Sequence, residues 1–355
     1  MQRTLPSQSF WNGKRVFLTG HTGFKGSWLS LWLQTLGAEV TGFALPASGN
    51  DALFHRARVS EGMASIHGDI RDLVTLEAAL HNAKPAVVIH MAAQALVRVS
   101  YEAPLDTFAT NIIGTANLLD AVRRCPGISA VVNVTSDKCY ENREWLWGYR
   151  ENEALGGHDP YSASTACAEI VGAAMRASFF PAGSGVAIAS ARAGNVIGGG
   201  DTARDRLIPD LIAAFAADTP AIIRNPLAIR PWQHVLEPLS GYLLLAERLV
   251  EDGSAHAEAW NFGPRDDDML PVCILADAMT TRWGDNARWM QDQASHPHEA
   301  HTLRLDATKS RQRLGWQPCW TLDQALDSIV AWHKASLRHE DMRAVTLGQI
   351  SAWLS

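Results

Sequence analysis

Two short stretches of the chain carry the side chains best suited to acid–base chemistry. Tyr161 lies in one of them, and the run Ser136-Asp137-Lys138 forms the other. A hydroxyl, a carboxylate and an amine in consecutive positions place a proton donor and a proton acceptor on one loop. A tyrosine becomes a base at neutral pH when a nearby positive charge lowers the pKa of its phenol from about 10. These residues together predict a site that moves protons.

Position 165 departs from the pattern that would activate this tyrosine. A lysine four residues after Tyr161 would lie on the same helical face and bring its ammonium beside the phenol. Thr165 stands there instead, and its hydroxyl carries no charge. A lost charged hydrogen bond is worth roughly 1.5–3 kcal/mol, which is about one to two decades in rate or binding. We therefore count Thr165 among the catalytic positions and expect it to slow the reaction.

A glycine-rich segment near the N-terminus indicates a bound dinucleotide. The run Gly20-His21-Thr22-Gly23-Phe24-Lys25-Gly26 follows the apolar stretch 15–19 and opens a helical pattern. Glycines let the backbone approach a pyrophosphate closely, and a helix N-terminus supplies N–H groups and positive potential. Because the segment has this strand–turn–helix context, it is a specific signal rather than an ordinary turn.

Short apolar runs alternate with helical patterns through the first half of the chain, which predicts the elements that must hold these residues. Strands are expected at 15–19, 38–45, 86–90, 130–134 and 186–191, with helices from the glycine turn to about 36 and at 111–124. Alternation of this kind predicts an α/β fold with a doubly wound parallel sheet covered on both faces, a Rossmann domain. After about residue 194 loops rich in Gly, Pro and Arg predict a smaller C-terminal substrate-binding lobe. We expect domains at 1–193 and 194–355, with segments near 230–250 returning to the first.

Composition excludes several classes of protein. The chain has 355 residues and a net charge of −6 without a basic run, so nucleic acid is not an expected partner. No apolar stretch has the length of a membrane span, and the first residues lack the order of a signal peptide. Five scattered cysteines predict buried thiols in a reducing cytoplasm. The run His298-Glu299-Ala300-His301 is one residue short of HExxH, so we expect no metal.

The GxxGxxG spacing resembles that of the extended short-chain dehydrogenases/reductases. Residues 68–72 resemble that group's adenine-contacting segment, and 90–94 resemble the loop that lines the cofactor. The end of the second strand, 41–44, offers neither an acid for a ribose hydroxyl nor an arginine for a 2′-phosphate, and we expect NAD because of the chemistry given below. The resemblance implies contacts to NAD from Gly20, Thr22, Gly23, Phe24, Lys25, Gly26, Asp69, Ile70, Ala92, Ala93, Gln94, Asn111 and Thr135.

A closer resemblance covers nearly the whole chain. Residues 9–26, 135–149, 192–201 and 229–239 are similar to the corresponding segments of CDP-glucose 4,6-dehydratases. This resemblance implies that Tyr161 removes the C4 hydroxyl proton while hydride passes to NAD⁺, with Ser136 hydrogen-bonding that hydroxyl. Lys138 would then take the C5 proton, Asp137 would protonate the departing C6 hydroxyl, and hydride would return to C6.

The implied substrate is a nucleotide sugar, with CDP-glucose favoured. Arg206 and Arg230 are candidates for its diphosphate, because guanidinium groups suit bidentate phosphate recognition. Asn195, His234 and Glu299 are further candidates for substrate contacts. A homodimer formed through the helices at 111–124 and 163–179 is implied by the resemblance alone.

Departures from the family pattern keep two alternatives open. Thr165 replaces the family's lysine, which also bonds the nicotinamide ribose, and Ala163, Thr202 and Leu227 differ near the expected pocket. One alternative is another nucleotide-sugar enzyme, such as a 4-epimerase, which oxidises C4 without removing water. The other is a catalytically impaired protein that binds NAD or a nucleotide sugar. The Ser-Asp-Lys run favours the dehydratase, because an epimerase has no need of that acid–base loop.

Overall fold

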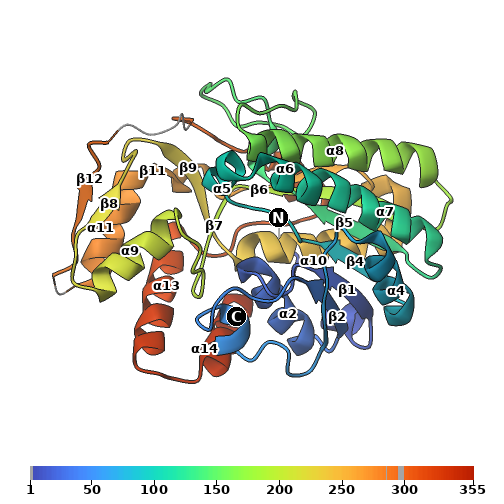
Figure 1. Ribbon diagram of the computed structural model, residues 1–355, viewed down its shortest axis with the longest axis horizontal. Helices are drawn as coiled ribbons and strands as arrows, with labels where there is room; N and C mark the ends of the chain where they lie inside the picture. Colours follow the sequence, from blue (N-terminus) through green and yellow to red (C-terminus); the bar gives the residue numbers. More distant parts are fainter. Residues whose placement is uncertain (1–2, 285, 295–299) are drawn as a thin grey trace.

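A computed structural model describes residues 3–284, 286–294 and 300–355. Seven strands of this part of the chain form one parallel sheet in the order β10-β6-β5-β4-β1-β2-β3, with helices on both faces (Figure 1). This confirms the predicted doubly wound α/β fold. The strands of the sheet are β1 (Arg15–Thr19), β2 (Glu39–Ala44), β3 (Ala64–His67), β4 (Val87–His90), β5 (Ala130–Val134), β6 (Ala187–Ala193) and β10 (Ala259–Phe262).

The helices around this sheet arise from the apolar patterns between its strands. Those of the first half are α1 (Gln8–Trp11), α2 (Phe24–Thr35), α3 (Leu53–Arg56), α4 (Leu73–Ala83), α5 (Val97–Glu102), α6 (Pro104–Phe108), the π-helical turn η1 (Ala109–Ile113), α7 (Gly114–Arg124), the 3₁₀ turn η2 (Asp137–Cys139) and α8 (Pro160–Phe179). The helix expected at 111–124 therefore begins with a π-helical turn that contains Asn111.

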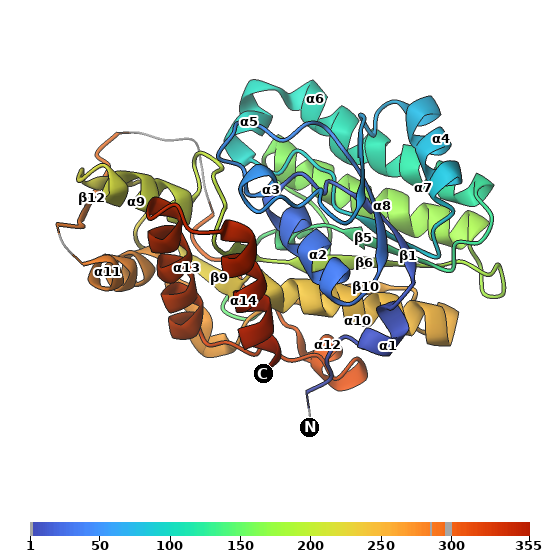
Figure 2. The same ribbon diagram turned by 90° about the horizontal axis from the view of Figure 1, so that it is seen from below.

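Two cores lie on opposite faces of the sheet, because successive side chains of a strand point to opposite sides. In β1, Val16 and Leu18 join one core with α2 and with α10 (Leu236–Asp252), whereas Phe17 joins the other with α4 and α7. Figure 2 shows α2, α10 and the C-terminal helix α14 (Met342–Leu354) together on one side of the sheet. Because helices cover both faces of the sheet, nearly every residue of its central strands is buried, and the sequences of these strands are therefore almost continuously apolar.

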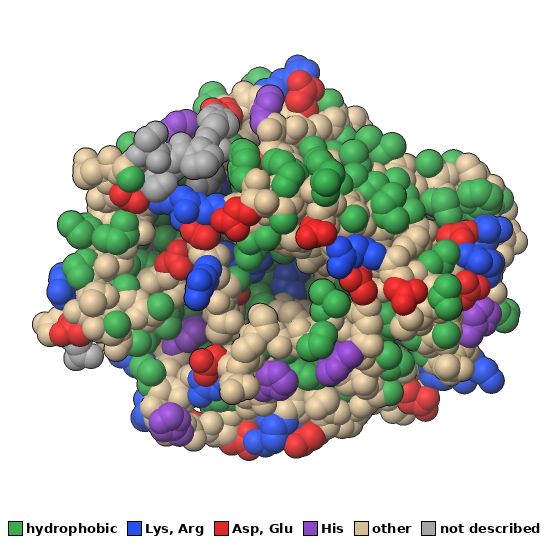
Figure 3. All heavy atoms as spheres, in the orientation of Figure 1, with side chains coloured by type: hydrophobic (Ala, Val, Ile, Leu, Met, Phe, Trp, Pro, Cys, Tyr) green, Lys and Arg blue, Asp and Glu red, His purple; other side chains and the backbone are tan. Residues whose placement is uncertain are grey.

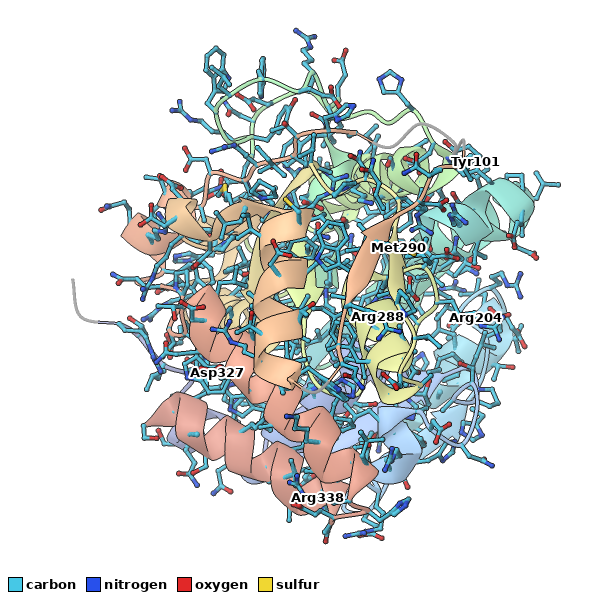
Figure 4. The ribbon with its side chains drawn as sticks, turned by 90° about the vertical axis from the view of Figure 1, so that its left-hand side faces the viewer. Tyr101, Arg204, Arg288, Met290, Asp327 and Arg338 are labelled. Atoms are coloured by element: carbon cyan, nitrogen blue, oxygen red, sulfur yellow. The ribbon has the colours of Figure 1, made fainter. Side chains whose placement is uncertain are left out.

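The second lobe has its own small sheets and core. One sheet has the order β11-β9-β7, and the other pairs β12 with β8. Figure 4 views this lobe from its outer end, where Met290 marks β12, Arg288 directly precedes that strand and Asp327 marks α13. Its elements are β7 (Asn195–Ile197), α9 (Leu207–Ala216), β8 (Ala221–Ile223), β9 (Ile229–His234), β11 (Met269–Pro271), α11 (Val272–Trp283), β12 (Trp289–Gln291) and α13 (Leu322–Leu337).

The chain crosses between the lobes more than once. After β9 it returns to the large sheet, where α10 packs against β5 and β6 and where β10 forms the edge strand. Short turns η3 (Gly253–His256) and η4 (Asp266–Asp268) and helix α12 (Thr308–Arg313) complete the described elements. A division of the lobes near residue 194 remains our proposal, with α10 and β10 assigned to the first. No helix in the described ranges is both long and apolar enough to cross a membrane.

Candidate active site

A cavity of about 320 Å³ lies between the two lobes, beyond the carboxyl ends of β5 and β6. Figure 3 shows a hollow in the middle of this face of the molecule, with basic side chains visible inside it. Ligands of open α/β sheets bind at this edge, because loops there leave a crevice beside the strand ends. Four residues predicted to be catalytic line the cavity: Ser136, Asp137, Lys138 and Tyr161.

Tyr161 lies in the first turn of α8, which Asp159 caps by accepting a hydrogen bond from the backbone N–H of Ser162. Burial raises the pKa of the Tyr161 phenol, and a hydrogen bond with the Ser136 side chain acts in the opposite direction. The Lys138 ammonium lies 6.0 Å from the centroid of the phenol ring. The serine, the lysine and the tyrosine are therefore brought together as the sequence predicted.

Asp137 is a buried carboxyl group, only one oxygen of which is hydrogen-bonded among the described residues. Its Oδ1 accepts a hydrogen bond from the Ser136 hydroxyl at 3.0 Å, whereas Oδ2 has no hydrogen-bond partner among the described residues. Burial raises the pKa of this carboxyl group, although the nearby charges of Lys138 and Arg230 oppose that shift. A carboxyl group held in its protonated form can donate a proton to a leaving hydroxyl.

Thr165 lies one helical turn beyond Tyr161 but is not part of the cavity lining. Its side chain is only 6% exposed, and its hydroxyl donates to the carbonyl of Ser162 at 2.9 Å. This hydroxyl is therefore engaged by the backbone of its own helix. Thr165 therefore brings no positive charge to the Tyr161 phenol.

The glycine turn has the shape that a dinucleotide needs. Gly20 has φ +76° and lies so close to the backbone of Met91 and Ala92 that a Cβ would clash at 2.8 Å. Gly26 packs on the carbonyl of Gly20, where a Cβ would lie at 2.0 Å. A Cβ at Gly23, the N-cap of α2, would meet a single atom within 4 Å, so the space before this helix is open to a phosphate. These residues fit a bound pyrophosphate.

Several predicted cofactor residues hold the walls of this crevice together. Asn111 accepts a hydrogen bond from the Gln94 N–H at 2.8 Å and donates to the Ser164 hydroxyl at 2.8 Å, which ties the loop after β4 to α8. The Thr135 hydroxyl donates to Glu169 at 2.5 Å, and the Thr22 hydroxyl donates to the Leu45 carbonyl at 2.8 Å. These side chains position the backbone around the crevice.

At the predicted adenine end of the crevice, side chains likewise hold the surrounding backbone in position. Asp69 accepts hydrogen bonds from the Arg71 guanidinium, the shortest at 2.6 Å, and Ile70 is buried against Gly114. Phe24 packs close to Gly198 of the second lobe, where a Cβ would lie 2.9 Å from the ring. Ala92 and Ala93 belong to the loop after β4. The backbone N–H of Ala92 donates to the Thr19 hydroxyl at 3.1 Å.

Lys25 differs from the other residues of the glycine turn. Its ammonium lines the reaction cavity and donates to the Tyr242 hydroxyl at 3.2 Å. Burial and the charge of Arg206 lower the pKa of Lys25 to about 8, while the charge of Asp137 acts in the opposite direction. The resemblance implies that Lys25 contacts NAD, and its side chain also lies in the cavity that holds the acid–base groups.

The structure places the predicted substrate-binding residues in different surroundings. Asn195 and Arg206 line the cavity, and Arg206 is paired with Asp201 at 3.0 Å. Arg230 also lines it, but its guanidinium donates to the backbone carbonyls of Ile229, Ala300 and His301. Arg230 therefore anchors the segment at 300–301 in addition to facing the cavity. Glu299 lies outside the described residues.

His234 is not brought to the cavity. Its ring is 1% exposed and contacts the rings of Trp28 and Trp320, at centroid distances of 5.7 and 4.8 Å. Burial lowers the pKa of His234 to about 3, so the ring is neutral. The sequence motif around it gave its position in the chain but not the direction of its side chain.

An arginine cluster at the cavity was not predicted. Asp205 binds Arg98 of α5 at 3.3 Å and Arg224 at 2.6 Å, and all three residues line the cavity. Arg98 belongs to the first lobe and Arg224 to the second, so no spacing in the sequence indicates that they meet. Within the described ranges, no group of three or more His, Cys, Asp or Glu side chains could hold a metal ion.

Comparison with known proteins agrees with this geometry. A family model described as GDP-mannose 4,6 dehydratase matches residues 17–329. The chain is 56% identical to the CDP-glucose 4,6-dehydratase of Salmonella typhimurium over 352 residues, which covers 98% of both chains. It is 25% identical to a dTDP-glucose 4,6-dehydratase of Xanthomonas campestris, with 89% of this chain and 92% of that protein covered.

Solved structures share the fold at lower identity. The dTDP-glucose 4,6-dehydratase DesIV of Streptomyces venezuelae, solved with NAD, has a TM-score of 0.77 at 22% identity, covering 93% of this chain and 99% of its own. A UDP-glucose 4-epimerase of Thermotoga maritima, solved with UDP-glucose, has a TM-score of 0.77 at 20% identity, with coverages of 91% and 99%. The family match and the 56% identity show that this chain belongs to the nucleotide-sugar 4,6-dehydratase family.

Proposed function

We propose that the protein is an NAD-dependent dehydratase that converts CDP-glucose to CDP-4-keto-6-deoxyglucose. The observation that carries this proposal is the meeting of Tyr161 with the Ser136-Asp137-Lys138 loop in one cavity, with a raised pKa at Asp137. An enzyme that only oxidises and reduces C4 needs no second acid–base pair, whereas elimination of water needs one group to take a proton and another to give one. The 56% identical CDP-glucose 4,6-dehydratase supports the choice of substrate.

The residues of the cavity divide the reaction into proton transfers. Tyr161 takes the proton of the C4 hydroxyl, and Ser136 holds that hydroxyl by a hydrogen bond. Bound NAD, for which the glycine turn is shaped, would accept hydride from C4 and return it to C6. The ketone at C4 acidifies C5, Lys138 takes the C5 proton, and Asp137 protonates the C6 hydroxyl so that it departs as water. Lys138 then returns its proton to C5 as C6 receives the hydride. One water is lost and no net oxidation occurs.

The remaining predicted contacts support the same proposal. Gly20, Gly23 and Gly26 would admit the pyrophosphate of NAD to the N-terminus of α2. Arg206 faces the cavity from the second lobe, where the substrate diphosphate would lie beside it. Thr165 keeps its hydroxyl within its own helix, so we expect turnover below that of a relative with lysine at this position.

A direct assay tests the proposal. Purified protein incubated with CDP-glucose and NAD⁺ should form a product that has lost one water and carries a ketone. A Tyr161→Phe variant serves as the matched control, because it keeps the ring and removes the ionisable hydroxyl. Formation of a C4 epimer without loss of water would replace the dehydratase by an epimerase. Binding of CDP-glucose with no chemical change would identify a catalytically impaired member of the family.

We also propose a homodimer formed through α7 and α8. These helices lie side by side on the outside of the first lobe (Figure 1), and Ile113, Ile170 and Phe179 on or next to them are about half exposed. A second copy of the chain would bury this apolar surface. Light scattering should give twice the chain mass, and Ile170→Asp should shift the protein to monomer. A monomeric wild-type protein would contradict the proposal.

A further inference from the structure

A buried ion pair adjoins the loop of Ser136, Asp137 and Lys138, the acid–base loop, and the proposed reaction does not use it. Arg192 of β6 donates two hydrogen bonds to the carboxylate of Glu169 of α8, at 2.9 and 3.0 Å. The two side chains are 4% and 3% exposed. Taking two charges out of water costs free energy that offsets much of their attraction, so such a pair contributes little net stability. What it supplies is a fixed set of directed hydrogen bonds to its neighbours.

The ion pair holds the residue just before the acid–base loop and a residue just after it. Glu169 accepts a hydrogen bond from the Thr135 hydroxyl at 2.5 Å, in addition to those from Arg192. The Arg192 guanidinium donates to the Tyr140 hydroxyl at 2.8 Å, and Tyr140 donates in turn to Asn261 at 2.7 Å. Burial raises the pKa of the Tyr140 phenol, so its hydroxyl stays neutral and fills both roles. Both ends of the loop are therefore tied to one buried pair.

The backbone hydrogen bonds inside the acid–base loop are long, so its position depends on contacts outside it. The two bonds that close its 3₁₀ turn η2 measure 3.2 and 3.4 Å, whereas about 2.9–3.0 Å is usual. This turn keeps Ser136 in hydrogen-bond contact with Tyr161 and keeps Lys138 over the ring of that tyrosine. A displacement of reacting groups by about 1 Å can cost about a hundredfold in rate. The hydrogen bonds of Thr135 and Tyr140 therefore bear on the reaction as well as on the fold.

We propose that Arg192 and Glu169 are positioning residues, which hold the acid–base loop in place beside Tyr161. They act through the hydroxyls of Thr135 and Tyr140, and neither is among the residues that line the cavity. Glu169 belongs to the same helix as Tyr161, about two turns beyond it, so the pair ties the loop to the helix that carries the base. The inference rests on the proposed function in taking this tyrosine and the loop as the reacting groups.

Tyr140→Phe removes one of these ties and leaves the ion pair intact, because Arg192 keeps its other hydrogen bonds. We expect kcat to fall about ten- to hundredfold, which is the worth of a hydrogen bond to a charged group. KM for CDP-glucose should change little, since Tyr140 does not line the cavity. Thr135→Val should lower kcat in the same way, whereas Thr135→Ser, which keeps the hydroxyl, should lose far less of it.

Tyr149→Phe is the matched control for the loss of a hydroxyl from a buried ring. The Tyr149 ring is buried and stacks on that of Tyr140, with 5.2 Å between centroids. Its hydroxyl donates to Asn142 and accepts from the Arg143 N–H, so it does not serve the ion pair. This variant should keep the kcat of the wild type. An unchanged kcat in Tyr140→Phe, or an equal loss in Tyr149→Phe, would overturn the proposal.

Hydrogen exchange measured by mass spectrometry tests the position of the loop without turnover. In the protein alone, the segment 135–140 should exchange faster in Tyr140→Phe than in the wild type and in Tyr149→Phe. Equal exchange in all three proteins would contradict the role of the ion pair in holding the loop. Absence of ketosugar from the wild-type protein would contradict the dehydratase assignment, and the exchange rates would still decide whether the pair holds the loop.

Discussion

The surroundings of Asp137 differ from those of an ordinary exposed aspartate. One oxygen is held by Ser136, the other has no partner among the described residues, and burial raises the pKa of the group. If the protonated form gives a proton to the C6 hydroxyl, the rate of elimination falls as pH rises through the pKa of Asp137. Asp137→Asn keeps the shape and removes the proton, so product formation should fall by about 10²–10⁴-fold.

The proton exchange of the sugar separates this role from a general loss of the site. Oxidation at C4 and removal of the C5 proton depend on Tyr161 and Lys138, so Asp137→Asn should still exchange deuterium from solvent into C5. Mass spectrometry of recovered CDP-glucose measures that exchange. Undiminished elimination in Asp137→Asn would show that another group protonates the leaving hydroxyl. Loss of both exchange and product would show that Asp137 is needed before elimination.

At the level of single residues, the sequence predicted which residues meet in the cavity better than it predicted where their side chains point. Ser136, Asp137 and Tyr161 meet because one follows a strand end and the other begins the next helix, an arrangement fixed by the fold. Lys25 and His234 were placed in the right segments, but their side chains turn toward Tyr242 and toward two tryptophans. A motif fixes the backbone position of a residue, whereas packing of distant elements sets the direction of its side chain.

Between elements, the ion pairs of Asp205 with Arg98 and Arg224 join the two lobes at the cavity. Asp205 holds Arg98 of α5 and Arg224 beyond β8, and each of these pairs is partly exposed. Exposed pairs contribute up to about 1 kcal/mol, so Asp205→Asn should leave the melting temperature nearly unchanged. It should remove the carboxylate that competes with the substrate diphosphate for Arg98 and Arg224, and so lower KM for CDP-glucose by up to about fivefold, with kcat unchanged. Steady-state kinetics measures both parameters.

A matched control exists on the outer end of the second lobe. Asp218 pairs with Arg288 at 3.6 Å, and Arg288 lies on the face shown in Figure 4, away from the cavity lining. Asp218→Asn removes the same charge and should change neither KM nor kcat. A rise in KM for Asp205→Asn would mean that its carboxylate orients the arginines for the substrate rather than competing with it.

The strands of the two lobes differ in how well sequence patterns predict them. The strands at 15–19 and 130–134 were predicted with their observed limits, because buried parallel strands have continuous apolar runs. The strands of the second lobe have only three to six residues and mixed composition, as in β9 with its Arg230 and Gln233. Their pairing depends on contacts between segments far apart in the chain, so no local pattern predicts it.

For the molecule as a whole, two buried carboxyl groups of α10 hold segments near both ends of the chain against the large sheet by hydrogen bonds. Glu237 accepts hydrogen bonds from the N–H groups of Cys319 and Trp320 and from the Trp353 indole, at 2.7–2.9 Å. Glu247 accepts from the Ser7 N–H at 2.7 Å and from the Trp11 indole at 2.6 Å. Burial raises the pKa of each of these groups to about 7.

These carboxyl groups give the folded protein a pH dependence of known sign. The folded state holds protons that the unfolded state releases between about pH 4.5 and 7, so the contribution of Glu237 to stability is present below 4.5 and is lost as pH rises through 7. The shift corresponds to about 3 kcal/mol across this range. Four buried histidines with lowered pKa values act in the opposite sense, namely His21, His90, His234 and His333.

The difference between a variant and the wild type isolates the contribution of Glu237. Glu237→Gln cannot titrate, so its free energy of unfolding relative to wild type should improve by about 3 kcal/mol between pH 4.5 and 8, whatever its offset at one pH. Denaturant unfolding across this range measures that change, with Glu39→Gln on an exposed position of β2 as the control. A difference that is constant with pH would show that Glu237 remains ionised in the folded protein. In that case its three N–H donors, rather than its proton, would hold the C-terminal segments on the sheet.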